Sequence, residues 1–215
     1  HSLYFASINR GKQSIGIDLK HSEGSALARR LADKADILVE NFRPGTMQRL
    51  GLDYDCVRAS NPRIVYASLS GFGQDAPYSD RGAYDVIVQA MGGLMGITGP
   101  EGGAPTRVGA SVGDLVPALY TVAGILAALH RRSTTGEGCH LDIAMMDCAF
   151  AVVENALARY WVSGTDPEPI GNRHPAITPF STFATLDGEI VIACGNDFLW
   201  QRLCEAIGVP GLASD

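Results

Sequence analysis

The sequence lacks the short motifs by which common catalytic sites are recognised. It has no G-x-x-x-x-G-K-[ST] phosphate loop, no H-E-x-x-H zinc motif and no G-x-S-x-G nucleophile elbow. Its histidines have no metal-ligand spacing, and the glycines of residues 92–99 follow an expected helix rather than a strand, which fits a dinucleotide fingerprint poorly. No standard nucleophile, metal or dinucleotide site is therefore indicated by motif.

The spacing of the cysteines and the net charge exclude further classes of protein. The five cysteines are odd in number and none are spaced as C-x-x-C, so we expect reduced, mostly buried thiols in an intracellular protein. A net charge of −6 argues against a general nucleic-acid binder. No uninterrupted run of about 18 apolar residues is present, so no membrane span is expected, and no signal peptide is visible.

The sequence does contain alternating strand and helix signals. Expected strands at 14–19, 36–39 and 63–69 alternate with expected helices, which indicates a parallel sheet of the α/β class. Further helices are expected over 84–93 and 113–132. A strand from Gly138 should lead into a long apolar helix that ends near Val162. A hairpin around 186–188 and a helix over 197–207 follow.

Asp147 is the only charge from Ala144 to Val153, near the start of that apolar helix. Such a helix is normally buried, and a lone buried carboxylate costs several kcal/mol unless it is paired or hydrogen-bonded. Helix electrostatics offers one explanation, since Asp in a first turn gains roughly 0.3–1 kcal/mol, and pattern alone favours it. The other explanation is a nucleophile that attacks an activated carbonyl. Glu154 and Asn155 are expected on the same helix face.

Taken together, several stretches resemble the family III CoA-transferases, the group of formyl-CoA transferase, the carnitine CoA-transferase and α-methylacyl-CoA racemase. The stretches cover nearly the whole chain in the right order. They are 2–20 (SLYFASINRGKQSIGIDLK), 39–45 (VENFRPG), 61–73 (NPRIVYASLSGFG), 124–130 (GILAALH) with 135–138 (TGEG) after it, and 141–149 (LDIAMMDCA).

The resemblance implies an enzyme that moves coenzyme A from an acyl-CoA donor to a carboxylic acid acceptor, without a metal. Asp147 would attack the donor thioester, giving a mixed anhydride and CoA thiolate. The thiolate would then attack the anhydride and leave an aspartyl-CoA thioester, and the acceptor acid would reverse both steps. Succinyl-CoA is the expected donor, from the general character of residues 171–183.

The resemblance also assigns the coenzyme A contacts. Cationic side chains among them suit phosphates, and Phe42 suits the adenine ring; without the resemblance each would be an ordinary solvated cation or core aromatic. The relatives' glycine-rich loop, which covers the aspartate, falls here on Gly171–Pro175 (GNRHP), which lacks a glycine run. The implied contacts are Ile17, Asp18, Leu19, Lys20, Asn41, Phe42, Arg43, Arg49, Gly82, Ala83, Tyr84 and Asp85.

Two alternatives stay open. One is an acyl-CoA racemase of the same family, but that branch places a catalytic histidine where this chain has Tyr84. Tyrosine cannot act as that acid or base near neutral pH without a large pKa shift, which favours the transferase. The other alternative is a non-catalytic fragment that binds CoA without a covalent intermediate.

The architecture implied is a large, Rossmann-like CoA-binding α/β domain over 1–179 whose N-terminal part is missing. Residues 180–215 would be the truncated beginning of a smaller α+β domain. Family members form intertwined dimers, so an interlocked homodimer is expected. No nucleic-acid or membrane partner is expected. The expected location is the cytoplasm, or the mitochondrial matrix in a eukaryote.

Overall fold

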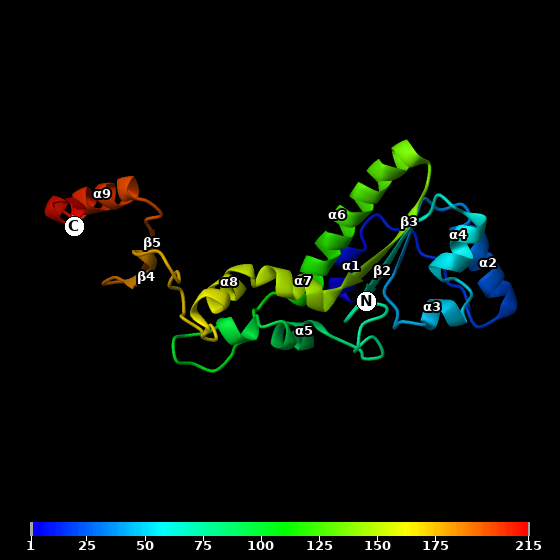
Figure 1. The fold of residues 1–215 in the computed structure, drawn as a ribbon, viewed down its shortest axis with the longest axis horizontal. Helices are drawn as coiled ribbons and strands as arrows, with labels where there is room; N and C mark the ends of the chain where they lie inside the picture. Colours follow the sequence, from blue (N-terminus) through cyan, green and yellow to red (C-terminus); the bar gives the residue numbers. More distant parts are fainter. Residues whose placement is uncertain (1, 215) are drawn as a thin grey trace. The chain divides into compact units, whose positions relative to one another are not determined.

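A computed structural model describes residues 2–214 of the chain (Figure 1). The chain divides into two compact units. The first, which we call the sheet unit, comprises the residues up to Ala83 together with Pro117–Met145. The second, which we call the hairpin unit, comprises Tyr84–Val116 together with the residues from Met146 onward. Each unit is described by itself below.

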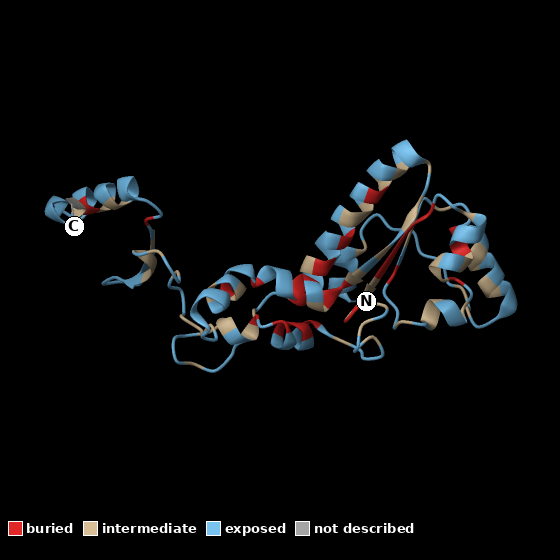
Figure 2. Ribbon diagram, viewed as in Figure 1, coloured by how far each residue is buried: buried red, intermediate tan, exposed pale blue. Residues whose placement is uncertain are grey.

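The sheet unit contains a three-stranded parallel sheet in the order β1-β2-β3. The strands are β1 (Ile37–Glu40), β2 (Val65–Ser70) and β3 (Cys139–Ala144), with Leu38 opposite Tyr66 and Tyr66 opposite His140. The central strand β2 is almost entirely buried, as a strand covered on both faces must be (Figure 2). The α/β class with a parallel sheet, which the strand and helix signals predicted, is therefore confirmed.

The sheet unit also contains the short helices α1 (Leu3–Ile8), α2 (Ser22–Ala32), α3 (Thr46–Arg49) and α4 (Tyr54–Ser60). Buried residues of α2 and α4 pack with β2, whereas α1 buries no residue. Asp53 caps α4 by accepting the Cys56 N–H at 3.1 Å, which satisfies one of the free donors of the first turn. The core is a cluster of buried residues from α2, α4 and β2 with the residue before β2, namely Ala32, Val57, Ile64 and Tyr66.

The expected strand over 14–19 was wrong. Residues 12–17 have no regular secondary structure, and Ile15 is 65% exposed. A strand needs a neighbouring strand to pair with its backbone groups. Residues 2–214 provide no such neighbour for this segment, so its alternating pattern does not mark a buried face.

The long helix α6 (Val112–Thr135) meets the length and composition criteria for a membrane span. No membrane span was expected because glycine, proline and polar residues interrupt the apolar residues of this helix, and the core helices of globular proteins meet the same criteria. Within the sheet unit, a Cβ at Gly124 would lie 3.4 Å from Leu141 of β3. Arg132 also pairs with Asp36 at 2.9 Å. These contacts attach the later turns of α6 to the sheet.

The hairpin unit holds the remaining elements. The expected hairpin is confirmed, since β4 and β5 pair antiparallel with Phe180 opposite Ala193. The elements are α5 (Asp85–Met91), the 3₁₀ helix η1 (Met95–Ile97), α7 (Met145–Val152), α8 (Glu154–Ser163), β4 (Phe180–Ala184), β5 (Glu189–Ala193), α9 (Asp197–Ala206) and the 3₁₀ helix η2 (Pro210–Ser214).

The single long helix expected after β3 is in fact two helices. The break is at Val153, whose φ of −94° and ψ of 20° lie outside the helical region. The Val153 N–H donates to the Phe150 carbonyl at 3.2 Å, a bond to the third preceding residue that tightens the last turn of α7. No Gly or Pro marks this position, so the sequence carried no sign of the break.

Candidate functional site

Two loops at the carboxyl ends of β1 and β2 carry residues predicted to bind CoA. Ligands of open parallel sheets sit at this edge. Glu40 ends β1, and its carboxylate accepts the Phe42 N–H at 2.8 Å, which fixes the start of the loop. At Gly71, just after β2, an added Cβ would lie 2.6 Å from the Ala83 side chain, so only glycine allows the two segments to approach this closely.

The structure brings Arg43 together with the predicted segment at Gly82 and Ala83. An added Cβ at Gly82 would lie 3.3 Å from Arg43 Nη2, so the guanidinium lies against this glycine. Arg49, one helical turn beyond Gly45, donates to the Thr46 hydroxyl at 2.9 Å. Two predicted contacts about forty positions apart in the sequence, Arg43 and Gly82, therefore lie together at one edge of the sheet.

Leu19 and Phe42 line one apolar cavity of about 290 Å³ in the sheet unit. The other walls come mainly from α2 and β1. A second, polar cavity of about 420 Å³ is lined by Arg43, Ser68 and His140, among others. Ser68 and His140 are hydrogen-bonded to each other at 2.9 Å. The loop after β1 therefore contributes one residue, Phe42, to an apolar cavity and the next, Arg43, to a polar cavity.

The predicted cations are free to bind an anion. Lys20, Arg43 and Arg49 are exposed, and none has a carboxylate partner among residues 2–214. Asp18 instead accepts the Lys20 backbone N–H at 3.0 Å, so it shapes the turn that presents Lys20. Ile17 is half-buried and Asn41 is exposed. The contacts of these residues with CoA stay predictions.

Asp85 is occupied within the hairpin unit. It is 8% exposed and accepts hydrogen bonds from Gln89 Nε2 at 2.9 Å, Arg107 Nη2 at 2.8 Å and the Gly113 N–H at 2.9 Å. Its neighbour Tyr84 is 81% exposed just before α5. A CoA contact at Asp85 stays a prediction, but these bonds already fill its carboxylate.

The pKa of Asp85 leads to a prediction about stability. Burial raises this pKa, but the hydrogen bonds from Gln89, Arg107 and Gly113 outweigh burial, so the pKa lies below its usual value. A depressed pKa stabilises the fold above the unfolded value of 3.8, and that contribution is lost as the pH falls through the folded-state pKa. We expect Asp85→Asn to lower the free energy of unfolding at pH 7 by about 1–2 kcal/mol, because solvent weakens the pair at the half-exposed Arg107.

Denaturant unfolding of the full-length protein at several pH values checks this prediction. The wild type and Asp85→Asn should converge below the folded-state pKa, whereas the exposed Asp166→Asn should match the wild type throughout. A difference between wild type and Asp85→Asn that stays constant down to pH 2 would contradict the assignment.

Asp147 lies in the first turn of α7, but it is exposed, so the expectation of a buried carboxylate was wrong. The buried side of α7 is formed by its neighbours Cys148 and Ala149, at 7% and 2% exposure. Phe150 is 52% exposed. An apolar helix sequence predicts burial all round, whereas α7 is covered on one side only. Among residues 2–214, no side chain pairs with the Asp147 carboxylate.

Cys148 next to it is a poor competitor as nucleophile. Burial, and then the negative charge of Asp147, raise the pKa of the Cys148 thiol. The thiolate is the reactive form of cysteine, so a raised pKa keeps this side chain inert. Asp147 is therefore the accessible side chain of the two, and its role as a nucleophile stays a prediction.

Helix α7 is held by close contact with α5. A Cβ added at Gly92, the residue that ends α5, would lie 2.8 Å from the Ala149 side chain and 2.8 Å from the Val88 carbonyl oxygen. Both helices show buried residues along this side (Figure 2). The position of α7, and with it the turn that carries Asp147, depends on the absence of a side chain at Gly92.

The Gly171–Pro175 loop is anchored rather than glycine-rich. The Gly171 N–H donates to the Gly99 carbonyl at 2.9 Å, and Arg173 pairs with Glu101 at 2.9 Å. His174 Nδ1 accepts the N–H groups of Ala176 and Ile177 at 3.1 and 3.0 Å. These contacts tie the loop to residues 99–101, and its role over Asp147 stays a prediction.

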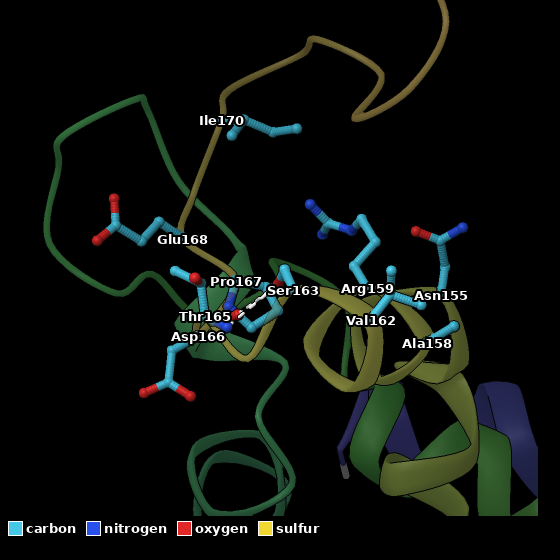
Figure 3. Close-up of a pocket in the computed structure, with 10 residues that line it drawn as sticks. All are labelled: Asn155, Ala158, Arg159, Val162, Ser163, Thr165, Asp166, Pro167, Glu168 and Ile170. Carbon is cyan, nitrogen blue, oxygen red and sulfur yellow. Dashed lines mark hydrogen bonds between the residues drawn. The ribbon is translucent and has the colours of Figure 1, made fainter.

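A separate cavity of about 750 Å³ lies along α8 and the segment that follows it (Figure 3). Arg159 and Asn155 point to the same side of α8, whereas the carboxylates of Asp166 and Glu168 point away from them. None of these residues was predicted as a contact. Sequence reasoning also missed Glu40, Gln89 and Arg107, whose hydrogen bonds hold the loops in place. Only the place of Glu40 at the end of a strand could have drawn attention to it.

Within the described part of the chain, no group of three or more His, Cys, Asp or Glu residues is arranged to hold a metal ion.

The chain matches the family described as CoA-transferase family III over residues 1–215. It is 48% identical over 215 residues to the acetyl-CoA:oxalate CoA-transferase of Acetobacter aceti, covering 100% of this chain and 55% of the relative. The succinate–glutarate CoA-transferase of Agrobacterium fabrum is 44% identical over 99% of the chain and 53% of the relative. The crystal structure of a CAIB/BAIF family protein from Brucella suis matches with a TM-score of 0.84 at 42% identity, over 99% of this chain and 56% of that one. The chain spans about half the length of these relatives.

Proposed function

The chain belongs to the family III CoA-transferases, and on that premise we propose that the whole protein moves coenzyme A from an acyl-CoA donor to a carboxylic acid. The similar proteins are named for oxalate, and for succinate and glutarate. Others are named succinyl-CoA:mesaconate and succinyl-CoA–D-citramalate CoA-transferases. These names support a small dicarboxylic acid as acceptor. The mesaconate and citramalate enzymes support succinyl-CoA as donor, whereas the Acetobacter aceti enzyme is named for acetyl-CoA.

The observation that carries the mechanism is the placement of Asp147. It is an exposed carboxylate in the first turn of α7 beside an inert thiol. Its carboxylate oxygen forms a bond to the donor's thioester carbon, and the C–S bond breaks to give a mixed anhydride and CoA thiolate. The thiolate then attacks the aspartyl carbonyl, which releases the donor acid and leaves the aspartyl-CoA thioester.

The acceptor acid completes the cycle by reversing these two steps. Its carboxylate attacks the aspartyl thioester, and the released thiolate attacks the acceptor carbonyl of the new anhydride, which returns Asp147 as a free carboxylate. A carboxylate is a weak nucleophile, so orientation and stabilisation of the oxyanion must supply most of the rate. The unpaired N–H groups at the start of a helix are suitable donors for an oxyanion.

CoA binding is proposed for the sheet edge. Lys20, Arg43 and Arg49 bind phosphate groups, since guanidinium and ammonium groups form charge-assisted bonds to phosphate oxygens. Phe42 and Leu19 line the apolar cavity that suits the adenine ring. Contacts at Ile17, Asp18, Asn41, Gly82 and Ala83 complete the site in the sheet unit, and CoA contacts at Tyr84 and Asp85 are proposed from the resemblance alone.

Three further parts of the proposal concern the whole protein. The large domain is proposed to extend to residue 179, with residues 180–215 beginning a smaller α+β domain. Two copies are proposed to form an interlocked homodimer. The proposed location is the cytoplasm, or the mitochondrial matrix in a eukaryote.

The covalent step is tested by trapping. We expect the full-length protein incubated with succinyl-CoA and then hydroxylamine to carry a hydroxamate on the peptide that contains Asp147, detectable by mass spectrometry. Asp147→Ala should give no adduct. If no acyl-CoA donor from a panel yields an adduct, the covalent mechanism is wrong, and solvent deuterium at the substrate α-carbon without CoA exchange would instead support a racemase. CoA binding with neither reaction would indicate a non-catalytic protein.

A further inference from the structure

Glu40 is a buried carboxylate at the end of a strand where an apolar residue would be the simpler choice. It is 7% exposed and has no ion-pair partner among residues 2–214. Burying a charge without a partner is costly unless hydrogen bonds compensate. Glu40 Oε2 accepts the N–H of Phe42 at 2.8 Å, two residues further along the chain.

The surroundings of Glu40 show what this bond controls. Glu40 lines both cavities of the sheet unit, the apolar one and the polar one. Phe42 lines only the apolar cavity, and Arg43 lines only the polar cavity. The bond to the Phe42 N–H therefore lies at the branch point where two consecutive side chains enter different compartments.

We propose that Glu40 is a positioning residue for the nucleotide part of coenzyme A. By holding the Phe42 N–H it fixes the rotation of the loop, so that Phe42 meets the adenine ring while Arg43 meets a phosphate. Loss of the bond lets the loop rotate, and both contacts weaken together. Glu40 acts through this bond, because its carboxylate oxygen Oε2 is already engaged with the Phe42 N–H. The inference rests on the proposed CoA site, and it adds a residue whose effect passes through the loop.

The test separates the nucleotide part of CoA from the rest. Full-length wild type and variants are assayed with succinyl-CoA and with succinyl-pantetheine, which lacks the nucleotide. Glu40→Met removes the acceptor at similar size, Glu40→Asp shortens its reach, and Glu40→Gln keeps an acceptor oxygen. We expect Glu40→Met and Glu40→Asp to raise KM for succinyl-CoA roughly tenfold, the effect of one lost hydrogen bond, with kcat within about twofold.

The same variants should leave kcat/KM for succinyl-pantetheine within about twofold of the wild type, and Glu40→Gln should restore most of the succinyl-CoA affinity. Asn196→Leu is the matched control. Asn196 Oδ1 accepts the Leu199 N–H at 3.0 Å in the hairpin unit, and Asn196 lines neither cavity of the proposed CoA site. Loss of this bond should not change the ratio between the two substrates.

Either of two results overturns the inference. One is an unchanged succinyl-CoA to succinyl-pantetheine ratio in Glu40→Met and Glu40→Asp. The other is an equal loss with both substrates, which is what a purely structural role predicts. A calorimetric measurement of CoA affinity distinguishes failure of this inference from failure of the proposed function. A wild type that binds CoA without transferring it refutes the transferase, while the variants still report on Glu40. A wild type that does not bind CoA refutes both.

Discussion

Replacing Asp147 by alanine in the full-length protein is expected to lower kcat for CoA transfer by at least roughly a thousandfold, the scale seen when a covalent nucleophile is removed. The loss follows because, in the proposed mechanism, the mixed anhydride and the aspartyl thioester both form on this carboxylate. The residues proposed to bind CoA belong to other segments, so calorimetric CoA affinity should stay within about threefold of the wild type. Steady-state kinetics with succinyl-CoA and a dicarboxylic acceptor measure the effect.

Glu154→Ala is the matched control for this prediction. Glu154 is also an exposed acid in the first turn of a helix, the one that follows α7. If helix electrostatics alone explained the acid at Asp147, the two variants would behave alike, each with a small loss of stability. More than a tenth of wild-type kcat in Asp147→Ala would refute the nucleophile.

Gly138→Ala is expected to destabilise the sheet unit more than alanine at Gly16, Gly71, Gly82 or Gly124. A Cβ at Gly138 would overlap the backbone of the two residues that precede β2, at the Ile64 carbonyl group and the carbonyl carbon of Arg63. Gly138 cannot move away, because its N–H donates to the Pro62 carbonyl at 2.9 Å and the next residue opens β3. Overpacking of this kind costs about 3 kcal/mol or more when the neighbour is backbone, which lowers Tm by roughly 6–12 °C.

Thermal unfolding of the full-length protein checks the expectation for Gly138. Gly16→Ala is the control, because a Cβ at Gly16 would meet no atom within 4 Å. That variant should unfold within about 2 °C of the wild type, since Gly-to-Ala changes at compatible positions alter stability only slightly. Equal Tm values for the two variants would contradict the prediction, because they would show that position 138 accommodates a side chain next to residues 63 and 64.

The sequence predicted the parts of the fold that local pattern controls. The strands at β1 and β2 carry runs of β-branched and apolar residues, and the hairpin carries its turn signal at Leu186–Gly188. The segment 14–19 has a similar alternation but no strand, because pairing depends on neighbours that a local pattern does not reveal. The break at Val153 was missed for the opposite reason, since its cause is tertiary and no Gly or Pro accompanies it.

The candidate site was predictable only where a motif could be compared with a family. Composition and spacing alone left Asp147 as an ordinary first-turn acid and Arg43 as an ordinary surface cation. The supporting contacts were beyond reach, because the Asp85–Arg107 pair joins residues 22 positions apart and the Arg43–Gly82 approach joins two separate loops. Such pairings arise from the path of the folded chain, and no single stretch of sequence encodes them.

The close packing at Gly92 restricts what either of two positions can carry. A Cβ at position 92 would lie 2.8 Å from the Ala149 side chain and 2.8 Å from the Val88 carbonyl oxygen. Replacing Ala149 by glycine removes only the first of these contacts, so alanine at 92 stays too close to the backbone of α5 even in a paired exchange. The helix turn that carries Asp147 is therefore held in place by a residue that takes no part in the proposed chemistry.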